Sequence, residues 1–117
     1  MSNFIIYHNP RCSKSRQTLD LLNEKGCEPK IFLYLEEELT FQDLKGVLQK
    51  LNIEPRDLLR KGEEEYKKNN LSNYKFNNED LINFMIKYPK LIERPIVIKE
   101  NKAVLGRPPE NALQLIG

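Results

Sequence analysis

The sequence predicts an α/β fold. The expected order of elements is strand, helix, strand, then a helical insertion, then two strands and a last helix. Three observations carry this prediction. A short apolar run at residues 3–7 is separated from a second one at 30–35 by a helix-compatible stretch. Helical periodicity then extends over about 40–89. Two further apolar runs near the end of the chain are separated by polar residues.

The first part of the chain has the pattern of a crossover unit. Residues 3–7 are expected to form a strand, residues 13–25 a helix and residues 30–35 a second strand. Because a helix connects the two strands, we expect them to pair in parallel. The sheet should therefore begin with a βαβ unit.

The insertion is expected to be helical. Thr40 and Asp43, three positions apart, are typical of a capping box and precede an amphipathic pattern. Pro55 is expected to begin a short helix over 56–61. The remaining expectations are a loop over 66–78, which is rich in Asn and Lys, and a helix from Asn78 that stops before Pro89.

The last part of the chain is expected to complete the sheet and cover it. The apolar runs at 95–98 and 103–105 predict a β-hairpin. Residues 109–116 can form a last helix with Leu113 and Ile116 facing inward. The sheet should then be mixed, with a βαβ part and a ββα part.

Composition and charge restrict the class of protein. A chain of 117 residues that is 39% apolar fits one domain over 1–117, with the helical insertion at about 40–89. The net charge is only +2 and acidic runs at 36–38 and 63–65 interrupt the cations, so no nucleic-acid partner is indicated. No segment approaches the roughly 20 apolar residues of a membrane span, and no leader pattern is evident. We expect a cytoplasmic protein that does not bind membranes.

Cys12 is the first candidate functional residue. It lies where the first strand gives way to a helix, and unpaired N–H groups and the dipole at a helix start favour a thiolate. Most lone cysteines in intracellular proteins are instead small buried apolar residues. Polar neighbours such as Arg11, Lys14 and Arg16 fit a core poorly. The local context leaves both the reactive and the structural interpretation open.

Cys27 is interpreted as structural. It lies fifteen positions after Cys12, which is about 20 Å along a helix, whereas a disulfide needs Cα atoms within about 7 Å. It follows Gly26, a candidate helix-ending residue, and precedes an apolar run. One histidine and two distant cysteines also offer no metal-ligand cluster, so no metal is expected.

The order of the expected elements, with Cys12 at the first strand-to-helix junction and Pro95 at the start of the third strand, resembles the thioredoxin-like fold. Four blocks of sequence resemble a particular family with this fold. More narrowly, the chain resembles the glutaredoxin-coupled ArsC-type arsenate reductase family, and within it the short YfgD-like branch, which ends soon after an Arg-Pro-Pro-Glu motif. The blocks are residues 6–16 (Ile-Tyr-His-Asn-Pro-Arg-Cys-Ser-Lys-Ser-Arg), 59–60 (Leu-Arg), 93–97 (Glu-Arg-Pro-Ile-Val) and 106–110 (Gly-Arg-Pro-Pro-Glu).

The resemblance implies a nucleophile and three anion-binding residues. Cys12 would attack the arsenic of arsenate, and Arg60, Arg94 and Arg107 would bind the oxyanion. Guanidinium groups suit this task because they bind such oxygens through two parallel hydrogen bonds. A cysteine with the free pKa of about 8.5 is only about 3% thiolate at pH 7, so nearby cations must usually assist the helix start. Without the family pattern, Arg60 would be read as a solvated surface charge, whereas Arg94 and Arg107, each directly before a proline at a strand boundary, fit a functional role slightly better.

Three more residues match family positions near the nucleophile. His8 is expected to have an electrostatic or thiolate-supporting role, the alternative being a hydrogen-bonded structural histidine. Ser15 is expected to donate a hydrogen bond to the Cys12 sulfur, the alternative being an ordinary polar residue of the first helical turn. Pro95 matches the proline that is cis and beside the active cysteine in thioredoxin-like proteins.

The adduct on Cys12 would need a second sulfur to discharge it. Position 15 is serine, so no Cys-x-x-Cys pair is present and an external thiol is required. The resemblance implies glutathione as co-substrate and glutaredoxin as the protein that then reduces the mixed disulfide. The expected protein is thus a monomeric oxidoreductase with a redox-active cysteine, no bound cofactor and arsenate or a similar oxyanion as substrate.

Two alternatives to arsenate reduction stay open. One is a glutathione-dependent thiol oxidoreductase that uses Cys12 on another substrate. The other is a non-enzymatic regulator like the Spx proteins of the same superfamily, which bind RNA polymerase. Those regulators commonly carry a Cys-x-x-Cys switch, so Ser15 counts against this alternative.

Overall fold

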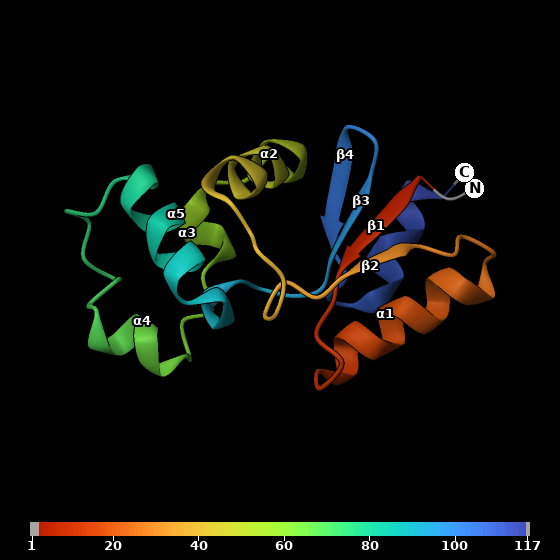
Figure 1. Cartoon of the computed structure of the whole chain (residues 1–117), viewed down its shortest axis with the longest axis horizontal. Coiled ribbons are helices and arrows are strands. Elements are labelled where there is room, and N and C mark those ends of the chain that lie inside the picture. The colour runs from red at the N-terminus through yellow and green to blue at the C-terminus, as the bar shows by residue number, and fades with distance from the viewer. Residues whose placement is uncertain (1–2, 117) are drawn as a thin grey trace. The chain divides into compact units, whose positions relative to one another are not determined.

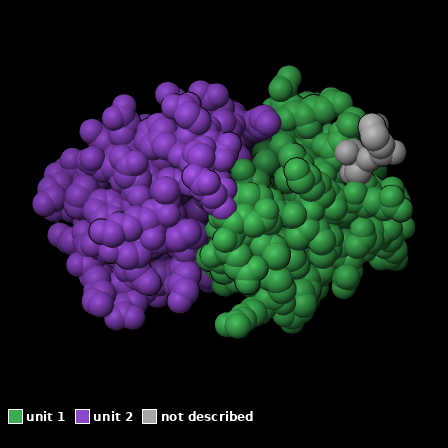
Figure 2. All heavy atoms as spheres, in the orientation of Figure 1, with its two compact units in different colours: residues 1–37, 94–117 green, residues 38–93 purple. Residues whose placement is uncertain are grey.

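The computed structural model describes residues 3–116. The chain forms two compact units (Figure 2), one from the residues up to 37 together with those from 94 onward, the other from residues 38–93. The second unit corresponds to the insertion expected at about 40–89. The expectation of a single domain over 1–117 stays a prediction.

The first unit contains a four-stranded mixed sheet in the order β2-β1-β3-β4 (Figure 1). Strand β1 pairs in parallel with β2 and antiparallel with β3, which in turn pairs antiparallel with β4. The predicted α/β class and mixed sheet are therefore confirmed. The strands are β1 (Phe4–Tyr7), β2 (Lys30–Phe32), β3 (Ile96–Lys99) and β4 (Lys102–Leu105), and helix α1 (Ser13–Glu24) connects β1 to β2.

Helix α1 and the 3₁₀ helix η2 (Pro109–Leu115) pack against each other, and η2 also packs against β4. Apolar side chains from the sheet and from both helices meet in one core, where they are removed from water. This core supports the end of β1, from which the chain enters the turn before α1. Its buried members are Phe4, Ile6, Leu22, Val97, Ala112 and Leu115.

The second strand is shorter than expected. It ends at Phe32 instead of residue 35, because the chain turns at Leu33. The Leu33 carbonyl accepts hydrogen bonds from the N–H groups of Glu36 and Glu37, and the Glu37 carboxylate accepts one from the Leu33 N–H. These local bonds replace the ladder bonds that a longer strand would make.

The last helix differs from the expected one in period. Residues Pro109, Ala112 and Leu115 are buried, so every third residue faces the core, as the three residues per turn of a 3₁₀ helix require. Leu113 is 38% exposed, and its expected inward orientation is wrong. Ile116 does pack against the core.

The second unit is helical. Helix α2 (Phe41–Leu51) starts with a capping box in which Thr40 accepts a hydrogen bond from the Asp43 N–H and the Asp43 carboxylate accepts one from Thr40. The same arrangement starts α5, so both predicted helices are confirmed. The other helices are α3 (Pro55–Leu58), α4 (Glu64–Lys68), α5 (Asn78–Lys87) and the 3₁₀ helix η1 (Pro89–Leu91).

Two boundaries in this unit were predicted wrongly. Helix α3 ends at Leu58 and not at residue 61, because Leu59 is extended and forms a β-bridge with Ile92. Helix α4 extends to Lys68, into the loop expected over 66–78. Its acidic first turn and basic last turn suit the helix dipole, and Lys68 lies 3.5 Å from Glu64.

No helix in residues 3–116 is long and apolar enough to cross a membrane.

Candidate active site

Cys12 occupies the N-cap position of α1. Its backbone is extended, with φ of −94° and ψ of 122°, and its side chain makes no capping hydrogen bond. Its N–H donates to the Asn9 carbonyl at 3.0 Å, and its own carbonyl accepts from the Arg16 N–H at 3.0 Å. The side chain is only 8% exposed. The sulfur thus lies at the positive end of a twelve-residue helix, where a thiolate is favoured.

Arg107 lies beside Cys12. Its Nη1 atom is 3.9 Å from the Cys12 sulfur and donates a hydrogen bond to the Arg94 carbonyl at 3.3 Å. A guanidinium at this distance stabilises a thiolate relative to a thiol. The structure therefore brings together two of the predicted site residues, 95 positions apart in the sequence.

Arg94 contributes more than its carbonyl. Its Nε atom is buried and has no hydrogen-bond partner within residues 3–116. Buried donors are nearly always paired in folded proteins, so this N–H is available for an acceptor from outside the chain. Pro95 follows it through a cis peptide bond and is itself buried, and the Pro95 carbonyl accepts a hydrogen bond from the Gly106 N–H.

His8 and Ser15 form a buried hydrogen-bonded pair. The His8 Nδ1 atom lies 2.7 Å from the Ser15 oxygen, which also accepts a hydrogen bond from the Asn9 N–H at 3.0 Å. Burial lowers the pKa of His8 below its usual 6.5, and the charge of Arg16 adds to this effect. The imidazole is therefore neutral near pH 7, and a hydrogen-bonding role is favoured over that of a cation.

The hydrogen bond expected from Ser15 to the Cys12 sulfur is not among those of the described part of the chain. The Ser15 oxygen is instead engaged with His8 and Asn9. The pair is connected to Cys12 through the turn before α1, because Asn9 donates to the Ser15 oxygen and its carbonyl accepts the hydrogen bond from the Cys12 N–H. The roles predicted for His8 and Ser15 stay predictions.

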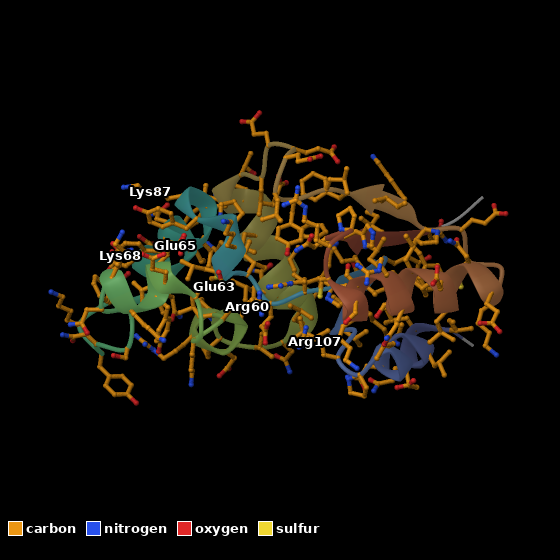
Figure 3. The ribbon with its side chains drawn as sticks, turned by 90° about the horizontal axis from the view of Figure 1, so that it is seen from below. Arg60, Glu63, Glu65, Lys68, Lys87 and Arg107 are labelled. Carbon is orange, nitrogen blue, oxygen red and sulfur yellow. The ribbon has the colours of Figure 1, made fainter. Side chains whose placement is uncertain are left out.

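Arg60 lies in the second unit close to Glu63 (Figure 3), and it also forms an ion pair with Glu93. Its Nη1 atom is 3.2 Å from the Glu63 carboxylate and its Nε atom is 3.0 Å from that of Glu93. Its N–H donates to the Leu91 carbonyl at 2.7 Å. The guanidinium charge is thus already balanced within this unit, whereas no ion pair of Arg107 occurs among residues 3–116. Its predicted anion-binding role stays a prediction.

Both cysteines are free thiols. Cys27 is partly buried and packs against the core of the first unit, as expected of a structural residue. Within the described residues, no group of three or more His, Cys, Asp or Glu side chains is placed to hold a metal ion.

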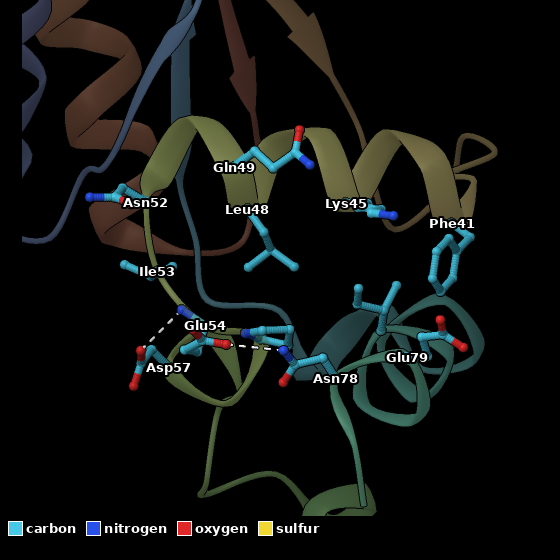
Figure 4. A pocket seen from close by; sticks show the side chains of 12 residues that line it. Phe41, Lys45, Leu48, Gln49, Asn52, Ile53, Glu54, Asp57, Asn78 and Glu79 are labelled. Carbon is cyan, nitrogen blue, oxygen red and sulfur yellow. Dashed lines mark hydrogen bonds between the residues drawn. The ribbon is translucent and has the colours of Figure 1, made fainter.

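The second unit has a hollow of about 580 Å³ between α2, α3 and α5 (Figure 4). Leu48 projects into it from α2, and at its edge Asn78 donates a hydrogen bond to the Glu54 carboxylate at 3.1 Å. None of the residues predicted for the active site lines this hollow. It therefore adds nothing to the Cys12 site.

Sequence reasoning missed Thr18 and Asn111 near Arg107, and it named Gly106 only as part of a block that carries the family resemblance. Thr18 is fully buried, Gly106 lies in close contact with it, and Asn111 binds the backbone next to Gly106. Thr18 had a signal, because it lies three positions after Ser15 and so shares a helical face with it. Asn111 had no comparable local signal.

A protein-family model decides the family of this chain, because the model of the ArsC family matches residues 7–115. The chain belongs to the ArsC family. It is 49% identical over 113 residues to YfgD, an uncharacterized protein of Escherichia coli K12, and the match covers 96% of this chain and 95% of YfgD. It is 45% identical to an arsenate reductase of Haemophilus influenzae, with 96% and 97% of the two chains covered.

Comparison with solved structures also places this chain with ArsC-type proteins. An arsenate reductase from Vibrio cholerae superposes with a TM-score of 0.94 at 44% identity, covering 97% of each chain. The fold is thus thioredoxin-like with a helical insertion, as predicted.

Proposed function

We propose that this ArsC-family protein is an arsenate reductase that uses a Cys12 thiolate with glutathione and glutaredoxin as reductants. The observation that carries the proposal is the Arg107 guanidinium, 3.9 Å from a sulfur at the start of α1. This arrangement favours a thiolate and leaves the cation available for a negatively charged substrate. Relatives named arsenate reductase, at 45% identity and 44% identity, support the choice of oxyanion.

The first step joins sulfur to arsenic. The Cys12 thiolate attacks the arsenic of arsenate, a sulfur–arsenic bond forms, and one arsenic–oxygen bond breaks as that oxygen leaves as water after protonation. Arg107 and the unpartnered Nε–H of Arg94 supply donors for the remaining oxygens. We assign Arg60 as the third anion-binding residue on the family pattern.

The second step transfers two electrons. A glutathione thiolate attacks the Cys12 sulfur, and the electron pair of the sulfur–arsenic bond moves to arsenic, which leaves as arsenite. Cys12 and glutathione are then joined in a mixed disulfide. A glutaredoxin thiolate attacks the glutathione sulfur of that disulfide and releases the Cys12 thiolate. A reduced glutathione pool is required, which supports a cytoplasmic location.

The test is arsenite production by the purified protein with arsenate, glutathione, glutaredoxin, glutathione reductase and NADPH. Cys12→Ser should abolish turnover, whereas the matched variant Cys27→Ser should keep most of it. Equal loss in both variants would contradict the proposal. A wild-type protein that forms the glutathione mixed disulfide at Cys12 but produces no arsenite would favour a thiol oxidoreductase with another substrate.

A further inference from the structure

We infer that Thr18 and Asn111 are positioning residues that hold the backbone of residues 105–107 so that the Arg107 guanidinium stays beside Cys12. The inference rests on the proposed function, because it concerns the thiolate that this function requires. It adds to the proposed function a positioning role for two residues that do not contact the Cys12 sulfur.

Gly106 brings three segments of the first unit into direct contact. A Cβ atom at this position would lie 2.7 Å from the Thr18 hydroxyl oxygen and 2.8 Å from the Pro95 Cγ atom, closer than real Cβ contacts allow. The Gly106 N–H donates to the Pro95 carbonyl at 2.9 Å. Helix α1, the start of β3 and the segment after β4 therefore meet at a residue without a side chain, and any larger residue would push them apart.

Thr18 holds this segment from the side of α1. Its hydroxyl is fully buried and lies 2.8 Å from the Lys14 carbonyl and 3.2 Å from the Gly106 carbonyl, so the two acceptors share one proton. The Lys14 bond is local to the helix, whereas the Gly106 bond spans 88 positions of sequence. Valine has the same shape, but it would leave the buried Gly106 carbonyl without this donor.

Asn111 holds the same segment from the side of η2. Its side-chain amide donates to the Leu105 carbonyl and to the Arg107 carbonyl, each at 3.1 Å. Together with Thr18, it binds the carbonyls of three successive residues. Such a complete set of bonds fixes the backbone from which the Arg107 side chain departs.

The position of the guanidinium depends on that backbone. Arg107 is exposed, and a free arginine side chain has many rotamers. Among the described residues, two groups hold its Nη1 atom, the Arg94 carbonyl at 3.3 Å and the Cys12 sulfur at 3.9 Å. The sulfur contact is already long, so a small shift of the backbone would separate the guanidinium from the Cys12 sulfur.

The first test measures how fast iodoacetamide alkylates Cys12 across pH, in a Cys27→Ser background so that one thiol reacts. Thr18→Val should slow alkylation at pH 7 by about threefold to tenfold and move its pH midpoint upward, since less thiolate is present. Thr18→Ser restores the hydroxyl and should stay within about twofold of the parent. Unchanged alkylation in Thr18→Val, or equal slowing in both variants, would overturn the inference.

The second test asks whether Thr18 acts through Arg107. In an Arg107→Gln background, Thr18→Val should change the alkylation rate by less than about twofold, because the group it positions is gone. Undiminished slowing there would overturn the inference.

Asn111→Leu provides a second route to the same answer if Thr18→Val does not fold. It should also slow alkylation, and this slowing should also vanish in the Arg107→Gln background; unchanged alkylation would overturn the inference. The assay uses no arsenate, so it separates the two claims. A parent protein whose alkylation midpoint is that of free cysteine, about 8.5, counts against the proposed function. A lower midpoint that Thr18→Val leaves unmoved counts against the inference alone.

Discussion

Helices α1 and α2 begin in opposite ways. At the start of α2, Thr40 and Asp43 satisfy each other's backbone N–H groups through their side chains. At the start of α1, Cys12 makes no such bond and the first turn carries no acidic residue. A side-chain N-cap typically stabilises a protein by about 1 kcal/mol. The start of α1 therefore lacks a stabilising contact, and its N–H groups and dipole remain available to a thiolate and an anion.

The buried faces of the two helices also differ, because that of α2 is apolar and that of α1 is partly polar. Helix α2 buries Leu44, Val47 and Leu48, whereas the buried residues of α1 are Ser15, Thr18 and Leu22. Apolar burial stabilises in proportion to area and tolerates small shifts, while buried hydroxyl groups require partners at defined positions. Helix α2 is thus built mainly for stability, and the first half of α1 for holding groups in place.

The largest expected change in the free energy of unfolding comes from a substitution on the apolar face of α2. Leu44→Ala removes a side chain with no exposed surface and should lower the free energy of unfolding by about 2–5 kcal/mol. Urea denaturation measures this loss. The matched control is Leu113→Ala, on a leucine that is 38% exposed, which should change stability by less than about 0.5 kcal/mol. Equal losses in the two variants would contradict the assigned burial.

Substitutions at the two N-cap positions should change the free energy of unfolding in opposite directions. Thr40→Ala should lower the free energy of unfolding by about 1 kcal/mol and leave alkylation of Cys12 unchanged. Cys12→Ser puts a good capping residue at the start of α1, and should raise the free energy of unfolding by up to about 1 kcal/mol while it abolishes turnover. Denaturation curves of both variants provide the measurement. A loss of stability in Cys12→Ser as large as that in Thr40→Ala would remove the proposed trade between stability and activity at α1.

The parts of this contrast that are local in sequence could be predicted. The capping box of α2 involves residues three positions apart, and the place of Cys12 at a strand-to-helix junction follows from the apolar pattern around it. The 3₁₀ period of η2 could not be read in this way, because an apolar pattern over seven residues fits either helix type. Leu113 was therefore placed on the wrong face.

The contacts that assemble the site are not local. Arg107 and Cys12 are 95 positions apart, and nothing in their neighbourhoods pairs them, so this contact was expected only through the family resemblance. Thr18 and Gly106 are 88 positions apart, and although Gly106 begins one of the blocks that carry the resemblance, Thr18 lies in none of them. Such pairs depend on how the sheet and helices pack, which the pattern of single residues does not encode.

The smallest expected effect is a loss of stability at acidic pH. It arises at His8, which is hydrogen-bonded to Ser15 of α1. Burial, assisted by the charge of Arg16, lowers the pKa of His8 below 6.5, against an opposing effect of Asp20. Below pH 6.5 the unfolded chain therefore takes up a proton that the folded protein resists, so the free energy of unfolding falls as the pH decreases and is unaffected above this range. His8→Asn keeps a polar group near Ser15 but does not titrate.

The wild type should lose stability relative to His8→Asn as the pH falls below 6.5, as thermal unfolding at matched ionic strength would measure. His8 is the only histidine of the chain, so no other imidazole contributes, and the carboxylates are the same in both proteins. Parallel profiles would mean that the pair formed by His8, in the turn before α1, and Ser15 of α1 adds no sensitivity to acid. The contrast with α2 would then rest on the N-caps and the buried hydroxyl groups alone.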